Sequence, residues 1–314
     1  MSHRVGIVVR TKQRPRFLAR ALADIANQTY TDAEVLVVND GGPRPEVEEV
    51  VAATAIAGRI SVLDTTAPGG RCAAANAGIR ASTAEFVVLH DDDDLWHPEF
   101  LARAVALLDA DPDDAGVMVP TEIVYEEPHG DGWRETGRVP FWAGLSAVSF
   151  TSLLEVNRAV PISFLYRRAV HEEVGYYDES LEAVEDWEFY LRLAARYPLG
   201  FLPGQALAFW TQRPGVRGAD ANSMFQLAAE HERDDAVVRD RALREWVALN
   251  GPGLPLYIAQ VEKRLREDFA RELGAQLERQ REAIMREIYD RHPIWRRLRR
   301  LRRRPDGSHA PGHS

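Results

Sequence analysis

Four consecutive aspartates, Asp91, Asp92, Asp93 and Asp94, directly follow the apolar run FVVLH. Adjacent carboxylates repel one another, and a divalent cation would remove that cost. Carboxylate oxygens are ligands that suit Mg²⁺ or Mn²⁺. A solvated acidic loop before a helix near Pro98 is the alternative interpretation. A position at the end of a buried strand favours the metal site, so Mn²⁺ or Mg²⁺ is the predicted cofactor.

Two glycine-containing segments could hold a nucleotide. Asp40, in the segment NDGG, could accept hydrogen bonds from a base or a ribose, although a simple strand-to-helix turn also explains it. Gly69 and Gly70 precede a helix whose amino end would favour phosphate, with Arg71 as a charged clamp. The chain has no GxGxxG and no GxxxxGK pattern, which disfavours dehydrogenase and NTPase functions.

A second acidic pair, Glu185 and Asp186, precedes the helical pattern WEFYLRLAAR. Asp186 could cap that helix, or it could act as a general base. Trp187 could belong to the core or to a substrate wall. Cys72, which has no second cysteine to pair with, is predicted to be a packing residue. The nine histidines form no HExxH pair, so a histidine-ligated zinc has no support.

The elements that position these residues alternate between strand and helix in the first hundred residues. Apolar runs begin at Val5, Glu34, Ile60 and Phe86, and helix-period segments cover 16–27, 45–55 and 71–81. Continuous apolar strands between helices predict a mostly parallel, Rossmann-like sheet of the α/β class. Ligands bind such sheets beyond the carboxyl ends of the strands, where the residues above lie.

The regular alternation of strand and helix ends after residue 116. The runs VMVPTEIVYEE, PISFLYRR and ALAFWTQ predict strands, EEPHGDGWRETG predicts a polar turn or flexible loop, and 185–196 predicts a helix. From Met224 onward the pattern is helical throughout. We therefore expect an α/β domain over 1–220, a helical extension over 221–304 with a basic amphipathic end, and a disordered tail over 305–314.

The helical extension carries an apolar stripe from Leu254 to Leu277, which could dock on the α/β domain or form a dimer seam, so an oligomer is possible. Eight arginines and no acids lie between Arg291 and Arg304. The segment HPIWRRLRRLRRR, including Arg296 to Arg304, has the composition of a helix attracted to anionic lipid. A solvated or oligomer-contacting tail explains the same residues.

Composition limits the disulfides, the cellular location and the partners that the chain could have. The chain has 314 residues, a net charge of −9 and one cysteine, so it can form no internal disulfide. The first residues lack the apolar core of a signal peptide, and no apolar run reaches the roughly 18 residues of a membrane span. We therefore expect a cytoplasmic protein, and the basic end allows a peripheral location on the inner face of the membrane. The acidic balance argues against nucleic-acid partners.

Five segments in order, over about residues 4 to 215, resemble the family 2 glycosyltransferases of the GT-A fold. They are VVRTKQRPRFLARAL, EVLVVNDGG, GGRCAAANAGI, FVVLHDDDDLWHPEFL and RRAVHEEVGYYDESLEAVEDWEFYLRLA. The resemblance implies a nucleotide-diphosphate sugar donor, a divalent metal, inversion at the anomeric carbon, and a glycan or lipid-linked glycan acceptor.

The resemblance also implies roles for individual residues. Thr11 and Asp40 would line the nucleoside pocket, Asp91 would face the ribose, Asp93 would hold the metal, and Asp186 would be the base. The further donor-binding candidates are Arg14, Arg71, Asn76 and Asp92, and the acceptor-side candidates are Glu185 and Trp187. The chain departs from the family pattern in Lys12 and Gln13, and in the absence of a histidine from the loop after ALAFWTQ.

Two other functions share part of this pattern. A nucleotidyltransferase on a related sheet also uses carboxylate-bound metal, but its first strand is typically followed by a basic, glycine-rich loop. The corresponding segment here, TKQRPR, has no glycine. A catalytically silent scaffold acting through its helical tail is the other alternative, and the presence of both acidic clusters argues against it.

Overall fold

The computed structural model describes residues 3–66, 69–222, 224, 227–292, 294 and 297. The chain divides into two compact units after Asp240, and each is described by itself. The division falls inside helix α9 (Ala228–Asn250), because Asp234 and Val238 are buried in the first unit. Residues 221–240, which the sequence assigns to the helical extension, therefore belong to the unit that carries the sheet.

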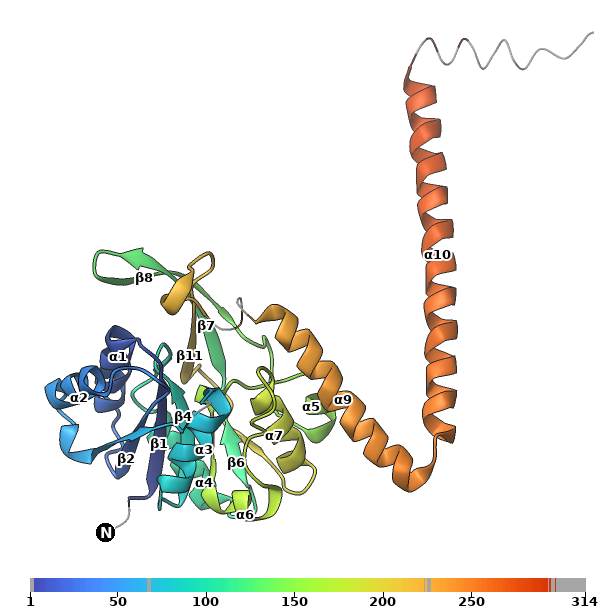
Figure 1. Cartoon of the computed structure of the whole chain (residues 1–314). Coiled ribbons are helices and arrows are strands. Elements are labelled where there is room, and N and C mark those ends of the chain that lie inside the picture. Colours follow the sequence, from blue (N-terminus) through green and yellow to red (C-terminus); the bar gives the residue numbers. More distant parts are fainter. Residues whose placement is uncertain are drawn as a thin grey trace, which may run out of the picture. The chain divides into compact units, whose positions relative to one another are not determined.

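The first unit contains a seven-stranded sheet in the order β10-β6-β9-β4-β1-β2-β3 (Figure 1). Its strands are β1 (Val5–Thr11), β2 (Ala33–Asn39), β3 (Ile60–Asp64), β4 (Phe86–Asp91), β6 (Gly116–Met118), β9 (Phe164–Arg167) and β10 (Gly200–Phe201). Strands β1 to β4 run parallel, whereas β9 is antiparallel to both β4 and β6. The carboxyl ends of β1, β2 and β4 therefore meet at one edge.

Helices cover both faces of this sheet. They are α1 (Pro15–Ala26), α2 (Arg44–Ala53), α3 (Arg71–Ala81), α4 (Phe100–Ala110), α5 (Phe150–Glu155), α6 (His171–Val174) and α7 (Glu185–Ala194). Short 3₁₀ turns occupy Ala57–Arg59, Pro161–Ser163, Arg168–Val170 and Gly218–Asp220. A proline in the first turn begins both α1 and α2, because its missing N–H has no partner to lose there.

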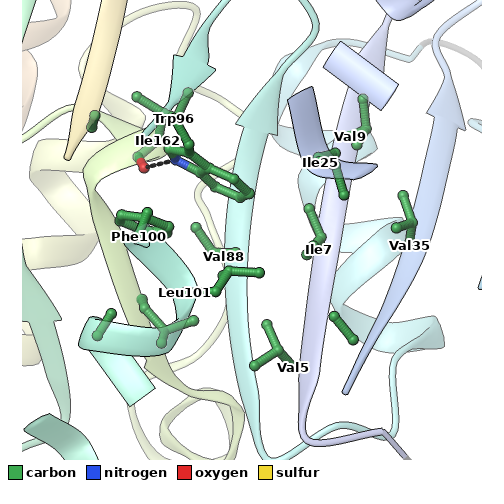
Figure 2. Packing of buried hydrophobic residues seen from close by; sticks show 14 of the residues in the cluster. Val5, Ile7, Val9, Ile25, Val35, Val88, Trp96, Phe100, Leu101 and Ile162 are labelled. Atoms are coloured by element: carbon green, nitrogen blue, oxygen red, sulfur yellow. Dashed lines mark hydrogen bonds between the residues drawn. The ribbon is translucent and has the colours of Figure 1, made fainter. Parts of the chain in front are cut away.

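The two-residue repeat of a strand divides the core into two clusters. Ile7 and Val9 of β1 pack with α1 and α4, whereas Val8 packs with α3 and α7 on the other face. Figure 2 shows the first cluster, in which the Trp96 indole donates to the carbonyl of Ile162 at 2.7 Å. On the second face α3 approaches so closely that a Cβ on Gly78 would lie 2.3 Å from Val8.

A smaller sheet, in the order β5-β11-β7-β8, packs beside the main one. Its strands are β5 (Leu95–Trp96), β11 (Ala208–Gln212), β7 (Thr121–His129) and β8 (Gly132–Pro140). Strand β11 pairs in parallel with β7 and antiparallel with β5.

The α/β class is confirmed, and so are the four early strands and three early helices. Two details differ from the sequence prediction. The run VMVPTEIVYEE is two strands in different sheets, β6 and β7, separated at Val119 and Pro120. The segment predicted to be a polar turn or flexible loop forms most of a hairpin, because residues 132–140 pair with 122–129 and only residues 130–131 turn.

The second unit contains the end of α9 and the long helix α10 (Gly253–Arg291), separated at Gly251 and Pro252. Along its described length α10 has no buried residue, and ion pairs one turn apart, such as Arg266 with Glu262, line its surface. Among the described residues no helix is long and apolar enough to span a membrane. The arginines from 296 to 304 lie outside the described residues except for Arg297, so their attraction to anionic lipid stays a prediction.

Candidate active site

A cavity of about 480 Å³ lies at the carboxyl ends of β1, β2 and β4, where the sequence predicts the donor. Its walls come from the segment after β1, the turn after β2, the first turn of α3, the aspartate cluster and the segment after β11. The lining residues are Arg10, Thr11, Lys12, Gln13, Arg14, Asp40, Arg71, Ala74, Asp91, Asp93, Asp94, Trp210, Gly218, Ala221, Asn222 and Met224. Thr11, Arg14, Asp40, Arg71, Asp91 and Asp93 are thus brought together as predicted.

Asp40 is held in place by the glycine turn before α3. Its Oδ1 accepts hydrogen bonds from the Gly70 N–H at 2.8 Å and the Thr65 hydroxyl at 3.0 Å, and its Oδ2 lies 3.3 Å from Lys12 Nζ. Burial raises the pKa of Asp40, but these three partners outweigh burial and hold the pKa below its usual value. Gly69 has φ +75°, and a Cβ there would lie 2.5 Å from Asp40 Oδ1. The turn therefore requires glycine and presents an ionised carboxylate.

Arg10, which the sequence analysis did not single out, connects the two acidic clusters. The residue is 5% exposed, and its guanidinium binds Asp91 through two hydrogen bonds of 2.8 and 2.9 Å. Arg10 Nη1 also lies 3.6 Å from Glu185 Oε1, and Arg71 Nη2 lies 3.4 Å from Glu185 Oε2. The sequence did contain a signal for this role: an arginine lies inside the otherwise apolar strand VGIVVRT. A buried cation requires an anionic partner, so its position predicts an ion pair.

The remaining aspartates of the cluster each have a partner. Asp92 is fully buried, accepts a 2.7 Å hydrogen bond from the Thr11 hydroxyl and binds the guanidinium of Arg14. Burial, opposed by Arg14 and assisted by the charge of Asp93, raises the pKa of Asp92 to about 7. Asp94 Oδ1 accepts from the Thr211 N–H at 2.8 Å. Asp92 does not line the cavity but fixes Thr11 and Arg14, which do, so its predicted contact with the donor stays a prediction.

The surroundings of Asp93 do not fit the divalent cation predicted from the sequence. One carboxylate oxygen, Oδ2, accepts hydrogen bonds from Arg213, from Arg14 at 3.4 Å and from Asn222 at 3.4 Å. Asp91 and Asp92 are each bound by a guanidinium of their own. Across the described part of the chain, no group of three or more His, Cys, Asp or Glu side chains could hold a metal ion. Guanidinium groups of the protein itself therefore already pair with Asp91, Asp92 and Asp93.

Asp186 has uncharged hydrogen-bond donors around it. Its Oδ2 accepts from Asn157 Nδ2 at 2.9 Å, and its Oδ1 accepts from the Trp187 N–H at 2.8 Å. Burial and the neighbouring charge of Glu185 raise the pKa of Asp186 to about 6, whereas these hydrogen bonds and Arg71 act in the opposite direction. The carboxyl group lies one residue from Glu185, which contacts two arginines of the cavity wall.

Two candidate residues lie outside the site. Asn76 is 1% exposed, and its amide binds the backbone of Tyr177 and the side chain of Glu179, so it fixes a loop and does not line the cavity. Trp187 is 2% exposed and donates its indole N–H to the Leu153 carbonyl, so it packs in the core and does not line the cavity. Burial raises the pKa of the Cys72 thiol to about 12, as a packing role requires.

The parallel sheet with its acidic cluster at the carboxyl edge, joined to a second small sheet, defines the GT-A class of fold. The chain is similar to the crystal structure of S. aureus TarS 1-349, with a TM-score of 0.54, 20% identity, and 67% and 60% of the two chains covered. For TarS 1-349 in complex with UDP-GlcNAc the TM-score is 0.56 at 20% identity, with 81% and 76% covered.

The family follows from the sequence comparisons. The model of "Glycosyl transferase family 2" matches residues 6–175, and the chain belongs to this family. It is 30% identical over 207 residues to the uncharacterized glycosyltransferase YwdF of Bacillus subtilis (strain 168), covering 64% of this chain and 71% of that protein. It is 21% identical to the putative colanic acid biosynthesis glycosyl transferase WcaA of Escherichia coli (strain K12), covering 62% and 67%.

Proposed function

We propose that this protein transfers a sugar from a nucleoside diphosphate sugar to a hydroxyl of a glycan or lipid-linked glycan, with inversion at the anomeric carbon. The observation that carries the proposal is the cavity at the strand ends, which combines four cationic side chains with the ionised Asp40. Cations suit a diphosphate, and a carboxylate suits the hydroxyl and N–H groups of a nucleoside. TarS, which shares the fold, has been solved with UDP and with UDP-GlcNAc.

Asp186 is the proposed general base. Inversion requires the acceptor oxygen to attack the anomeric carbon opposite the departing diphosphate while a base removes its proton. Glu185 is less suited to this role because its two oxygens, 3.6 and 3.4 Å from guanidinium nitrogens, already have cationic partners. No ion pair within the described residues involves Asp186, and its raised pKa of about 6 suits a general base.

Binding of a nucleoside diphosphate tests the donor proposal directly. We expect one of UDP, GDP and dTDP to raise the thermal unfolding midpoint, because a ligand that binds only the folded state stabilises it. At 100 times the Kd this amounts to about 2.7 kcal/mol, or about 5–10 °C for a unit of this size. If none of the three nucleoside diphosphates raised the midpoint by more than about 1 °C at millimolar concentration, the proposed donor class would be wrong.

The pH dependence of transfer tests the base. Asp186 accepts the proton only in its ionised form, and its pKa lies at about 6. We therefore expect kcat to be level above pH 7 and to fall towards tenfold per pH unit below pH 6. Replacing Asn157 with alanine removes a hydrogen bond to the ionised carboxylate, so this acid limb should move to higher pH. An acid limb that stays in place in Asn157→Ala would argue against Asp186.

A further inference from the structure

Arg213, directly after β11, is a fully buried cation locked behind Asp93. Its Nη2 donates to Asp93 Oδ2, its Nη1 donates to the Thr211 hydroxyl at 2.8 Å, and its Nε donates to the Asp220 carbonyl at 2.9 Å. The guanidinium carbon lies 4.5 Å from the centre of the Phe17 ring and 5.2 Å from that of Trp133. Every face of this guanidinium therefore has a partner, and its position is fixed.

Arg14 approaches the same carboxylate from the cavity side. Its side chain is 18% exposed, lines the cavity, binds both oxygens of Asp92 and lies 3.4 Å from Asp93 Oδ2. Asp93 thus lies between a buried guanidinium and a cavity-facing one. A divalent cation bound to Asp93 would be close to both positive charges, and like charges at that separation disfavour its binding.

The rest of the cavity wall is also cationic. Arg10, Lys12 and Arg71 line the cavity with Arg14, and each of the aspartates 91, 92 and 93 accepts a guanidinium. Arginine presents a planar fork of donors that matches a phosphate, and it remains charged at every physiological pH. The groups that a diphosphate needs are therefore supplied by the chain itself.

We propose that the protein binds the diphosphate of its donor through arginine and lysine side chains without a divalent ion, with Arg14 facing the diphosphate and Arg213 positioned behind Asp93 to neutralise it. The inference rests on the proposed function and states which groups of that site balance the negative charge of the diphosphate. In transfer, the bond from the anomeric carbon to the diphosphate oxygen breaks and its electron pair stays on that oxygen. The acceptor oxygen forms the new bond, and its proton passes to Asp186. The cations stabilise the added negative charge.

The first test uses the whole wild-type chain and needs no variant. The Kd of the nucleotide that stabilises the protein is measured by calorimetry in EDTA and in 1 mM Mn²⁺, and free Mn²⁺ is followed by its EPR signal. We expect Kd values within about twofold in the two buffers, and no uptake of Mn²⁺ by protein with nucleotide beyond that of nucleotide alone. Binding that requires Mn²⁺, or that it strengthens tenfold or more, would overturn the inference and leave the proposed function intact. No nucleotide binding in either buffer would reject both.

The second test compares variants in EDTA. Arg14→Gln should raise the nucleotide Kd at least about tenfold, because it removes a cation that faces the diphosphate. Arg213→Gln should raise it similarly by leaving Asp93 under-neutralised, and Arg213→Lys should restore most of the affinity. Arg138→Gln is the matched control, since Arg138 pairs with Glu122 and Glu135 and does not contact Asp93. Folding of each variant is checked by circular dichroism. A folded Arg213→Gln variant with the wild-type Kd would contradict the role of Arg213. If Arg213→Gln does not fold, the comparison of wild-type Kd values in EDTA and in Mn²⁺ decides the proposal.

Discussion

Replacing Asp186 with asparagine is expected to lower kcat by about 10²–10⁴-fold, the usual contribution of a positioned general base. The nucleotide Kd should stay within about twofold, because Asp186 is not among the residues that line the cavity. The amide has one oxygen, so it can accept from Asn157 or from the Trp187 N–H but not from both as the carboxylate does. A loss of stability of about 1 kcal/mol should accompany the loss of activity.

The control for this variant is Glu188→Gln, the same chemical change one position beyond Trp187 on α7. Glu188 pairs with Arg192 on its own helix. Transfer is measured by release of nucleoside diphosphate in the presence of an acceptor. Transfer by Asp186→Asn within about tenfold of wild type, at equal folding, would remove Asp186 from the mechanism.

Replacing Arg10 with methionine is expected to destabilise the first unit by about 3–5 kcal/mol. The side chain is 6% exposed, and its removal leaves Asp91 without its ion pair and Glu185 with Arg71 alone. A buried charge that loses its partner costs far more than an exposed one, since it has no water to replace the lost interaction. The measurement is urea unfolding of the whole chain followed by fluorescence and circular dichroism.

The matched comparison is again an arginine in two ion pairs, Arg138, whose side chain is 44% exposed. Arg138→Gln should change the free energy of unfolding by about 1 kcal/mol or less, because solvent screens exposed pairs. Adding Glu185→Gln to Arg10→Met should restore part of the lost stability, because the double variant removes one of the two carboxylates that lose Arg10. Equal effects of the two arginine substitutions would show that the Arg10 pairs are not electrostatically important.

The strands and helices that build the cavity could be predicted because their signals are local. Runs such as VGIVV and FVVL are buried on both faces, so they are apolar throughout, and each is followed by polar residues at the same sheet edge. The cavity position follows from that edge alone. Strand β8 gave no such signal, because residues 132–140 are mostly exposed.

The roles of individual polar residues were harder to predict because they depend on partners distant in sequence. Arg213 meets Asp93 across 120 residues, and no local pattern indicates that pairing. Asn76 was predicted to bind the donor, although helix geometry places its side chain on another face of α3. It lies five residues after Arg71, which turns its side chain by about 140° around α3, away from the wall that Arg71 lines. Its partner is the loop at Tyr177.

The long sequence separation between Asp93 and Arg213 also sets the order in which the site can be completed during biosynthesis. At about 5–20 residues per second, about 6–24 s pass between the synthesis of the two residues. Arg10 and Arg14 are made before the aspartates, so Asp91 and Asp92 can find their cations at once. Asp93 can meet Arg14 early, but its buried partner Arg213 is made only with the segment directly after β11. A nascent chain shorter than this holds Asp93 with one of its two guanidinium partners, so the diphosphate site is completed only when most of the first unit has been made.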